Sequence, residues 1–576
     1  MDRGDGTAWE ADAGAWQVPG SAKAGGGGLC EPWRLERTEY LKRTLTARVY
    51  DVAQESPLEA AAQLSDQLGC EVLLKREDIQ QVFSFKLRGA FNKMASLPRE
   101  KLRNGVVCSS AGNHAQGVAL GARQLGCEAT ICMPLTTPQI KVQAVRRLGA
   151  KVELVGKTYD ACQDHALRLA EERGLAFIHP FDDPYTICGQ GTIGVEVLRQ
   201  CPDLANLHAI FVPVGGGGLL AGIAAFVKQV APEVLVFGVE PEDSNCLAMA
   251  LDRGHRVTLD KIDGFADGVA VKTVGAETFR VAREFCDGVI QVGNDEICAA
   301  IKDVFTSTRS ILEPAGAVGL AGLKAYAARH REELGLRPGG RGDEGGEGPG
   351  GAQSSDPPAM VAILSGANMN FDRLRVVSEL ANVGAKREVM LATSIPETPG
   401  SFKRFVMALA GNDAGEGGPD VTEFKYRFSV GEEAHILYSL AVEGEAELLE
   451  LMARLKAAGL GTMDLSNCEP AQMHLRHLVG GRARSFTGPI PDEQLFSVTF
   501  PERPGALTDF LNVLAPGMNI TLFHYRNTGN NESQVLVGVQ EPPQLRGQFE
   551  EELSGLKYKY SRVEGLAQEA FELFLY

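Results

Sequence analysis

The feature that most constrains the fold is an alternation of short apolar runs, turns and helical patterns between residues 39 and 385. Turns that contain glycine, serine or proline follow the apolar runs at 106–108, 129–133, 209–214 and 361–364. Strand, turn and helix repeated in this way predict an α/β fold with a mostly parallel sheet. In such a fold the turns at the carboxyl ends of the strands face one crevice, where ligands bind.

A lysine opens one of the predicted helices, within the heptapeptide Ser84-Phe85-Lys86-Leu87-Arg88-Gly89-Ala90. Its apolar neighbours favour a desolvated side chain, and desolvation lowers the pKa of a lysine. A neutral amine can form a Schiff base with an aldehyde. The alternative is an ordinary first-turn lysine whose head stays in water, and the heptapeptide alone favours this alternative.

Four consecutive glycines, Gly215, Gly216, Gly217 and Gly218, separate a predicted strand from a helix that begins at Leu219. Backbone N–H groups in such a turn can approach an anion closely, and the helix N-terminus adds its positive dipole end. No lysine and serine follow, so the turn is not a P-loop. A dinucleotide fingerprint is the competing interpretation, with Gly216-x-Gly218-x-x-Ala221 at the pyrophosphate and Glu240 on a ribose.

Two further turns carry polar groups at the same predicted edge of the sheet. The run Ser109, Ser110, Ala111, Gly112 and Asn113 offers hydroxyls, an amide and N–H groups, which suit a carboxylate. Helix capping explains one of its serines but not the whole run, and we expect the following His114 to pack or cap. Ser365 ends the last apolar run, where its hydroxyl can either bond a neutral ring nitrogen or cap a helix.

The composition is that of a globular protein, since 44% of the 576 residues are hydrophobic and 23% are charged. The length predicts two to four domains, and no apolar run reaches the roughly 18 residues that span a bilayer. The net charge of -17 argues against nucleic acid or an anionic membrane as the main partner. Twelve cysteines without a CxxC pair indicate reduced thiols, not disulfides or zinc.

We expect a disordered tail at 1–38, a catalytic domain at 39–385 with a disordered insertion at 337–358, and two smaller modules at 386–482 and 490–576. The tail carries acidic residues, unlike an arginine-rich transit peptide, and lacks the apolar core of a secretory signal. No targeting peptide is readable. A soluble protein of the cytoplasm or of an organelle matrix, plastid or mitochondrion, is therefore expected.

The two modules are predicted from an internal repeat. The segment Pro396-Glu397-x-Pro399-Gly400 recurs as Pro501-Glu502-x-Pro504-Gly505, and Phe424-Lys425-Tyr426-Arg427 recurs as Phe523-His524-Tyr525-Arg526. Each copy predicts strand, helix, strand, strand, helix and strand, which is a ferredoxin-like pattern. Two such copies suit a pair of small-molecule sensors, and a purely structural role in dimerisation is the alternative.

A reactive lysine, a phosphate turn, a carboxylate turn and a partner for a neutral ring nitrogen together match the needs of pyridoxal phosphate. Residues 39–576 resemble the biosynthetic threonine dehydratases (threonine ammonia-lyases), which are fold-type II pyridoxal-phosphate enzymes with two C-terminal ACT-like regulatory modules. The matching stretches are Ser84-Phe85-Lys86-Leu87-Arg88-Gly89-Ala90, Ser109-Ser110-Ala111-Gly112-Asn113-His114-Ala115-Gln116-Gly117, Pro213-Val214-Gly215-Gly216-Gly217-Gly218-Leu219 and Ser365-Gly366-Ala367-Asn368.

The resemblance implies a role for each of these residues. Lys86 holds the cofactor aldehyde and later takes the α-proton of the substrate. Phe85 packs near the cofactor ring, Asn113 bonds its 3′-oxygen, and Ser365 faces its pyridine nitrogen. The phosphate lies on Gly215, Gly216, Gly217, Gly218 and Leu219. The substrate carboxylate lies on Ser109, Ser110, Ala111, Gly112 and Asn113, and Ser110 joins Lys86 as a catalytic residue.

The implied activity is the deamination of L-threonine, with L-serine secondary, to 2-oxobutyrate and ammonia. This is the first committed step of isoleucine biosynthesis, and inhibition by isoleucine, with valine as a second effector, is the expected control. We place the effector contacts near Tyr426 and Tyr525, and we expect a homotetramer.

One departure from related enzymes is informative. Serine racemases of this fold hold a metal near the position of Glu240, with a carboxylate six residues later, where this chain has Cys246. We therefore expect no metal there. A serine/threonine dehydratase or racemase without isoleucine control is the runner-up, and a nicotinamide-dependent enzyme and a catalytically inactive amino-acid sensor are the alternatives of other classes.

Overall fold

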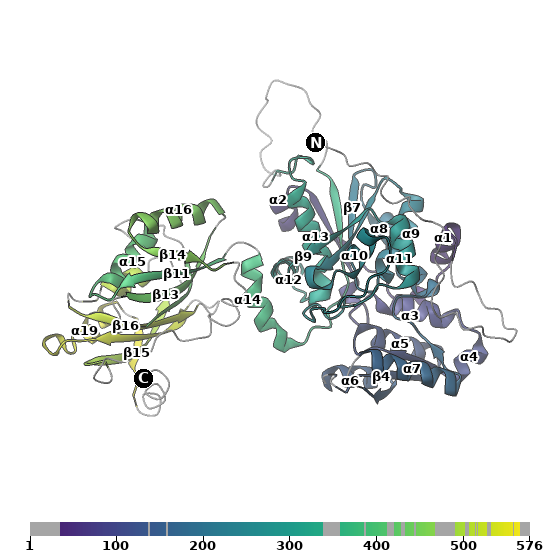
Figure 1. Cartoon of the computed structure of the whole chain (residues 1–576), viewed down its shortest axis with the longest axis horizontal. Helices are drawn as coiled ribbons and strands as arrows, with labels where there is room; N and C mark the ends of the chain where they lie inside the picture. The colour runs from purple at the N-terminus through teal and green to yellow at the C-terminus, as the bar shows by residue number, and fades with distance from the viewer. Residues whose placement is uncertain are drawn as a thin grey trace, which may run out of the picture. The chain divides into compact units, whose positions relative to one another are not determined.

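A computed structural model describes residues 35–135, 137, 139–156, 159–337, 357–384, 388–411, 420–427, 433–442, 445–466, 490–501, 506–512, 514, 517–526, 532–556 and 558–564. The chain divides into two compact units, Met1–Ala381 and Asn382–Tyr576 (Figure 1). Most of the predicted tail and of the predicted insertion at 337–358 lies outside the described residues. Among the described helices, none is both long enough and apolar enough to cross a membrane.

The first unit is built around a six-stranded sheet in the order β1-β2-β10-β7-β8-β9, in which only β1 is antiparallel to its neighbour. Its strands are β1 (Leu58–Ala60), β2 (Glu71–Arg76), β7 (Leu207–Pro213), β8 (Leu235–Pro241), β9 (Gly288–Val292) and β10 (Ala359–Leu364). Every residue of β10 is buried. Helices cover both faces of the sheet, which explains why its central strands are continuous apolar runs.

Two hydrophobic cores lie on opposite faces of this sheet. In β10, Val361 and Ile363 belong to one core, whereas Met360, Ala362 and Leu364 belong to the other. The first core is completed by helices α1 (Arg37–Leu45), α8 (Pro184–Gln200), α9 (Gly218–Val230), α10 (Cys246–Arg253) and α11 (Ala276–Phe285). The second is completed by α2 (Ala62–Leu68), α12 (Asn294–Thr308), α13 (Pro314–Arg329) and α14 (Leu374–Gly384).

A second, four-stranded parallel sheet in the order β5-β4-β3-β6 is inserted between β2 and β7 of the chain. It consists of β3 (Val106–Ser109), β4 (Ala129–Met133), β5 (Lys151–Leu154) and β6 (Ala176–Phe177), with α4 (Arg99–Asn104), α5 (Asn113–Leu125), α6 (Gln139–Arg147) and α7 (Tyr159–Arg173). The predicted α/β class with mostly parallel sheets is confirmed. The structure adds which strands pair in each sheet, because strand order along the chain does not show this.

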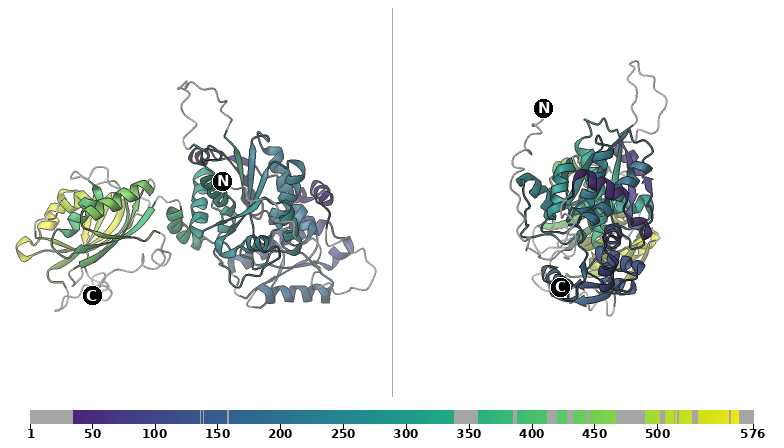
Figure 2. Two further views of the ribbon diagram at one scale, coloured as in Figure 1. Left: turned by 45° about the horizontal axis from the view of Figure 1, so that its top comes forward. Right: turned by 90° about the vertical axis from the view of Figure 1, so that its right-hand side faces the viewer.

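The second unit, which is drawn in green to yellow in Figure 2, contains strands and helices. Its strands form one eight-stranded antiparallel sheet in the order β14-β11-β13-β12-β16-β17-β15-β18. Its elements are β11 (Glu388–Pro396), α15 (Ser401–Ala410), β12 (Asp420–Arg427), β13 (Glu433–Ala441), α16 (Glu445–Ala457), β14 (Gly461–Asp464), β15 (Glu493–Pro501), α18 (Ala506–Asn512), β16 (Asn519–Arg526), β17 (Glu532–Gln540), α19 (Gln548–Gly555) and β18 (Lys559–Arg562). The order strand, helix, strand, strand, helix, strand therefore occurs twice, as predicted.

The two copies meet at their repeated Phe-x-Tyr-Arg segments. Strands β12 and β16 pair antiparallel, so that Phe424 lies opposite Tyr525 and Tyr426 lies opposite Phe523. Each strand also has a register irregularity at the same repeat position, between Val421 and Glu423 and between Ile520 and Leu522. The repeat therefore has a structural cause, since both copies contribute the same strand to one central pairing.

Helix α3 (Lys86–Ala95) lies against α5 and α8, and two glycines of the sequence motifs allow the close approach. A Cβ atom on Gly89 would lie 2.4 Å from Nε2 of Gln190 in α8. A Cβ atom on Gly117 of α5 would lie 3.0 Å from the backbone nitrogen of Leu87. Any side chain at either position would push α3 outward and displace Lys86, its first residue.

A buried ion network around Arg88 also anchors α3. The guanidinium group of Arg88 is fully buried and binds Glu77 at 2.7 and 2.8 Å and Glu196 at 2.5 and 3.0 Å. Nζ of Lys75 lies 2.6 Å from the carboxylate of Glu196. Burial alone would raise the pKa of Glu77, but the nearby Arg88 outweighs it and holds that pKa below its ordinary value.

We predict that Arg88→Met destabilises the first unit by about 3–5 kcal/mol, because the carboxylates of Glu77 and Glu196 lose the fork that neutralises both. The midpoint of thermal unfolding, followed by calorimetry, measures the loss. Lys151→Met is the matched control, since its ion pair with Glu128 is largely exposed and is worth less than about 1 kcal/mol. Equal midpoints for the two variants would contradict the anchoring role of Arg88.

Candidate active site

The side chain of Lys86 is the centre of the site. Its Nζ lies 3.3 Å from the carbonyl oxygen of Pro180 and 5.2 Å from the centre of the Phe85 ring. Burial lowers the pKa of Lys86 to about 8, and the carboxyl group of Glu313 opposes part of this shift. The desolvation that the apolar neighbours predicted is present, and it makes a neutral amine available near neutral pH.

The segment that leads into Lys86 is held against the end of β10. The backbone nitrogen of Phe85 donates to the Ser365 carbonyl at 3.2 Å, and that of Ala367 donates to the Phe83 carbonyl at 2.8 Å. These bonds hold Phe85 beside Ser365 at the end of β10. The Ser365 hydroxyl is buried and donates to the Ala315 carbonyl at 3.1 Å, so its bonding to a ring nitrogen requires the hydroxyl to rotate.

The tetraglycine turn is a close-packed cradle. A Cβ atom on Gly216 would lie 2.2 Å from the ring of Phe181, and Gly217 has a φ of +89°, which few residues other than glycine adopt. The Gly216 carbonyl accepts from the Thr278 hydroxyl at 2.7 Å, which fixes the turn. Within the described chain, the N–H groups from Gly215 to Leu219 have no protein acceptor, which leaves them free for an anion.

The carboxylate turn connects β3 to α5. The N–H group of Ser110 donates to the Cys132 carbonyl at 3.1 Å, and that of Gly112 donates to the Ser110 hydroxyl at 3.3 Å. Neither the N–H group of Ala111 nor that of Asn113 bonds an acceptor in the described chain. The turn therefore presents a hydroxyl and free donors at the N-terminus of α5, which suits a carboxylate.

Asn113 belongs to a polar network that the sequence interpretation missed. Its Nδ2 donates to Glu313 at 2.5 Å, and its Oδ1 accepts from Asn368 at 2.7 Å. Burial raises the pKa of Glu313 to about 7, although the bond from Asn113 lowers it. Glu313 precedes Pro314, the first residue of α13. In the sequence, the Glu313-Pro314 pair predicts that a helix begins here. It does not predict that the start of this helix lies beside Lys86.

The turn after β6 also contributes to the site without having been predicted. Pro180 accepts from Lys86, Phe181 packs on the glycine turn, and Asp182 accepts from the first N–H groups of α11. The closely spaced Pro and Asp residues at 180–184 were the available signal for this turn. His114 packs here as expected, since its buried ring bonds the Ile178 carbonyl at 2.8 Å. Burial and the charge of Lys86 lower its pKa to about 3.

Glu240 is not available to a ribose. It is fully buried, and its carboxylate accepts from the backbone nitrogens of Leu247 and Ala248 at 2.9 and 2.8 Å at the start of α10. The Cys246 sulfur lies 3.8 Å from the same carboxylate, and burial raises the pKa of Glu240 to about 7. The geometry therefore disfavours the dinucleotide interpretation of Gly216, Gly218 and Ala221.

The predicted effector residues lie in the second unit. Tyr426 and Tyr525 are buried on the paired strands β12 and β16, and they occupy one face of the sheet because Tyr525 lies opposite Phe424, two residues before Tyr426. The Tyr426 hydroxyl donates to Glu397 of the repeated Pro-Glu-x-Pro-Gly motif at 3.1 Å. Their assignment as effector contacts stays a prediction.

The first unit thus brings a desolvated lysine, a cradle of free N–H groups for a phosphate and a carboxylate-binding turn to one place, and this donor set fits pyridoxal phosphate. The fold and site are those of a fold-type II pyridoxal-phosphate enzyme. Residues 49–336 match the family described as pyridoxal-phosphate dependent enzyme, and residues 379–475 and 488–575 match the C-terminal regulatory domain of threonine dehydratase. The chain belongs to the threonine dehydratase family.

Individual relatives agree with this assignment. The chain is 52% identical over 539 residues to threonine dehydratase 1 biosynthetic, chloroplastic, from Solanum lycopersicum, covering 93% of this chain and 82% of the relative. It is 50% identical over 541 residues to a biosynthetic L-threonine dehydratase of Burkholderia multivorans, covering 93% and 99%. The processed form of threonine deaminase isoform 2 from Solanum lycopersicum superposes with a TM-score of 0.55 at 51% identity, covering 60% of this chain and 88% of that structure.

We predict that the apoprotein takes up pyridoxal phosphate with a pH dependence centred near 8, because only the neutral amine of Lys86 attacks the aldehyde and its pKa is lowered to about 8. The rate should rise as the pH increases through this value. Stopped-flow absorbance of the cofactor follows the reaction. In Glu313→Gln the centre should move to lower pH, because the carboxylate that favours the ammonium form is removed. A centre near the ordinary lysine value of about 10.4 would contradict the desolvation of Lys86.

We also predict that Gly216→Ala weakens binding of pyridoxal phosphate about tenfold or more. The new Cβ atom collides with the Phe181 ring, and overpacking of this kind costs about 1–3 kcal/mol. Equilibrium dialysis of the cofactor gives the affinity. Gly264→Ala is the control, because a Cβ atom at that position has open space around it. Unchanged affinity in Gly216→Ala would show that the turn does not form the phosphate cradle.

Proposed function

We propose that this chain is a threonine ammonia-lyase that converts L-threonine to 2-oxobutyrate and ammonia, with L-serine as a secondary substrate. The observation that carries the proposal is the desolvated amine of Lys86 together with two sets of free N–H groups, those from Gly215 to Leu219 and those of Ala111 and Asn113. The threonine dehydratase names of the relatives support the choice of substrate.

Pyridoxal phosphate, when bound, supplies an aldehyde that takes the amino group of the substrate and a ring that accepts the electrons left by the departing α-proton. Lys86 takes that proton at Nζ, and its lowered pKa keeps the free amine neutral at mildly alkaline pH. The hydroxyl of Ser110 and the N–H groups of Ala111 and Asn113 hold the substrate carboxylate. These donors fix the orientation of the α-carbon toward Lys86.

The remaining predicted residues hold the cofactor. Gly215, Gly216, Gly217, Gly218 and Leu219 bind its phosphate, Phe85 packs on its ring, and Asn113 bonds its 3′-oxygen. Ser365 lies by the ring nitrogen of the cofactor. Its hydroxyl does not keep that nitrogen protonated, whereas a carboxylate would. Glu313 orients the amide of Asn113 through their 2.5 Å hydrogen bond. Elimination removes the β-hydroxyl of threonine as water and leaves an enamine. Hydrolysis of the released enamine to 2-oxobutyrate and ammonia consumes one water, so the net reaction neither uses nor forms water.

The second unit is proposed to sense isoleucine, with valine as a second effector, through modules at 386–482 and 490–576. The match to a regulatory domain of threonine dehydratase supports an effector role. Tyr426 and Tyr525 are the proposed contacts, because they share one face of the two central strands. A homotetramer is proposed as the assembly. The chloroplastic name of the tomato relative supports the organelle matrix over the cytoplasm.

The decisive experiment measures 2-oxobutyrate formation against threonine concentration, with and without isoleucine. We expect a sigmoidal curve that isoleucine shifts to higher threonine, with a change in apparent affinity of about 5–150-fold, as is typical of allosteric coupling. Lys86→Ala should lose turnover. Tyr426→Ala and Tyr525→Ala should keep turnover and lose the isoleucine shift, whereas Tyr560→Ala, a tyrosine on the edge strand β18, should keep both.

Each result contradicts a different part of the proposal. A wild-type chain that turns over neither threonine nor serine excludes the lyase and favours the amino-acid sensor. A hyperbolic curve that ignores isoleucine keeps the dehydratase and removes the proposed role of the second unit. An isoleucine shift that persists in both tyrosine variants removes only the assignment of Tyr426 and Tyr525.

A further inference from the structure

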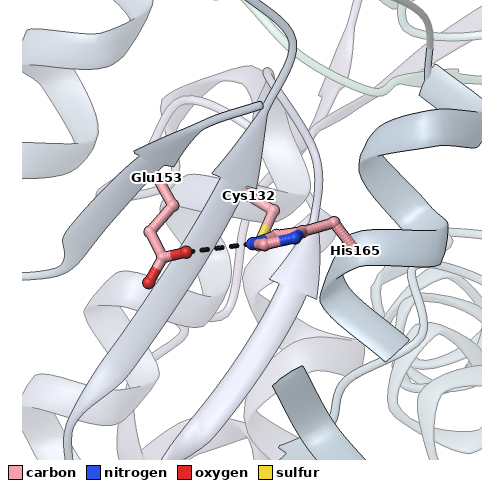
Figure 3. A group of neighbouring side chains, drawn as sticks. All are labelled: Cys132, Glu153 and His165. Atoms are coloured by element: carbon pink, nitrogen blue, oxygen red, sulfur yellow. Dashed lines mark hydrogen bonds and ion pairs between the residues drawn. The ribbon is translucent and has the colours of Figure 1, made fainter. Parts of the chain in front are cut away.

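Three side chains on the small sheet of the first unit converge outside the site described above. Cys132 of β4, Glu153 of β5 and His165 of α7 point toward one another (Figure 3). Their ligand atoms all lie within 4.8 Å of one another, and Nε2 of His165 is 3.1 Å from Oε2 of Glu153. Cys132 is buried, whereas the other two side chains are partly exposed. A small ion can therefore reach the cluster from solvent.

We infer that Cys132, Glu153 and His165 bind a zinc-class divalent cation, with a fourth position left open to water. A thiolate, an imidazole and a carboxylate are the three side-chain ligands that zinc uses, and three protein ligands with one solvent ligand form a common zinc arrangement. A purely oxygen-seeking ion such as magnesium would not select the sulfur of Cys132.

The surrounding contacts leave the ligand atoms available. In the described chain, Sγ of Cys132 makes no hydrogen bond, and the ten described cysteines are free. Arg173 binds Oε1 of Glu153 at 3.4 Å, so that Oε2 is the oxygen that faces His165. The side chain of Arg173 is 56% exposed, which allows it to turn away from an incoming cation. An ordinary Glu-His ion pair explains two of the three side chains but not the thiol beside them.

Binding exchanges a proton for the ion. Only the thiolate is a metal ligand, so the S–H bond of Cys132 breaks when the sulfur–metal bond forms, and its proton leaves to solvent.

The cluster lies directly behind the carboxylate turn. Cys132 is in register with Ser109, and the Cys132 carbonyl accepts from the N–H group of Ser110 at 3.1 Å. An ion on Cys132 would fix the strand that supports Ser110. The ligands are nevertheless distinct from every group placed in the active site, so loss of the ion and loss of the proposed activity can be measured separately.

The test uses the full-length holoenzyme, treated with a chelator and kept reduced with a phosphine. Cobalt(II) is titrated first, because a thiolate ligand gives it an intense charge-transfer band, and zinc affinity is then measured by competition with a fluorescent chelator. The variants are Cys132→Ser, Glu153→Gln and His165→Gln. Cys127→Ser and His255→Gln are the controls, since neither residue belongs to the cluster. The visible absorbance of the bound cofactor checks that each variant is folded.

We expect one ion per chain and a charge-transfer band that Cys132→Ser abolishes. Zinc binding should weaken at least about 10–100-fold in Glu153→Gln and His165→Gln and stay unchanged in both controls. A wild-type chain that binds no cobalt overturns the inference. The inference is also overturned if the charge-transfer band persists in Cys132→Ser, or if the zinc affinity is unchanged in His165→Gln. If Cys132→Ser fails to fold, the zinc affinities of Glu153→Gln and His165→Gln still test the inference, because these two residues are partly exposed.

Discussion

The buried guanidinium of Arg88 is the constraint on which the first unit depends. It neutralises two carboxylates from different parts of the chain, Glu77 beside β2 and Glu196 in α8. Buried ion pairs add little net stability compared with apolar packing, but removal of one partner is costly because a charge is left without water or a counterion. The main effect of the network is therefore to fix the position of α3, and its net contribution to the stability of the fold is small. That position decides where Lys86, two residues earlier, presents its amine.

Close packing supports the same placement. Gly89 and Gly117 remove side chains where α3 meets α8 and α5, and Gly216 does so where the glycine turn meets Phe181. Protein interiors tolerate little extra volume, so each glycine has a packing reason in addition to any contact with the cofactor. The lysine is held by the packing of α3 against α5 and α8, and the phosphate cradle by the packing of its glycine turn against Phe181. Little reorganisation is then required when a cofactor and a substrate bind.

The second unit uses a different principle. Its two copies share a single sheet because each contributes the same strand, β12 or β16, to the central pair. The pairing places Tyr426 and Tyr525 on one face, although 99 residues separate them in the chain. A ligand that contacts this face would meet both copies at once. Repetition thereby turns two ferredoxin-like folds, each with an open edge, into one body that can respond to an effector as a whole.

The sequence by itself determined the α/β class, the repeat and the motif residues, because strand–turn–helix periodicity and glycine-rich turns are local signals. It also determined which turns end strands, and hence that the glycine turn, the carboxylate turn and Ser365 would face one crevice. Only the tertiary structure decided which strands pair in each sheet, that Glu313 and Phe181 complete the site, and that Cys132, Glu153 and His165 converge. These residues are far apart in sequence and carry no motif. Their proximity arises from strand pairing and helix packing, which depend on burial and close contact across the whole unit and not on the order of residues within any one segment.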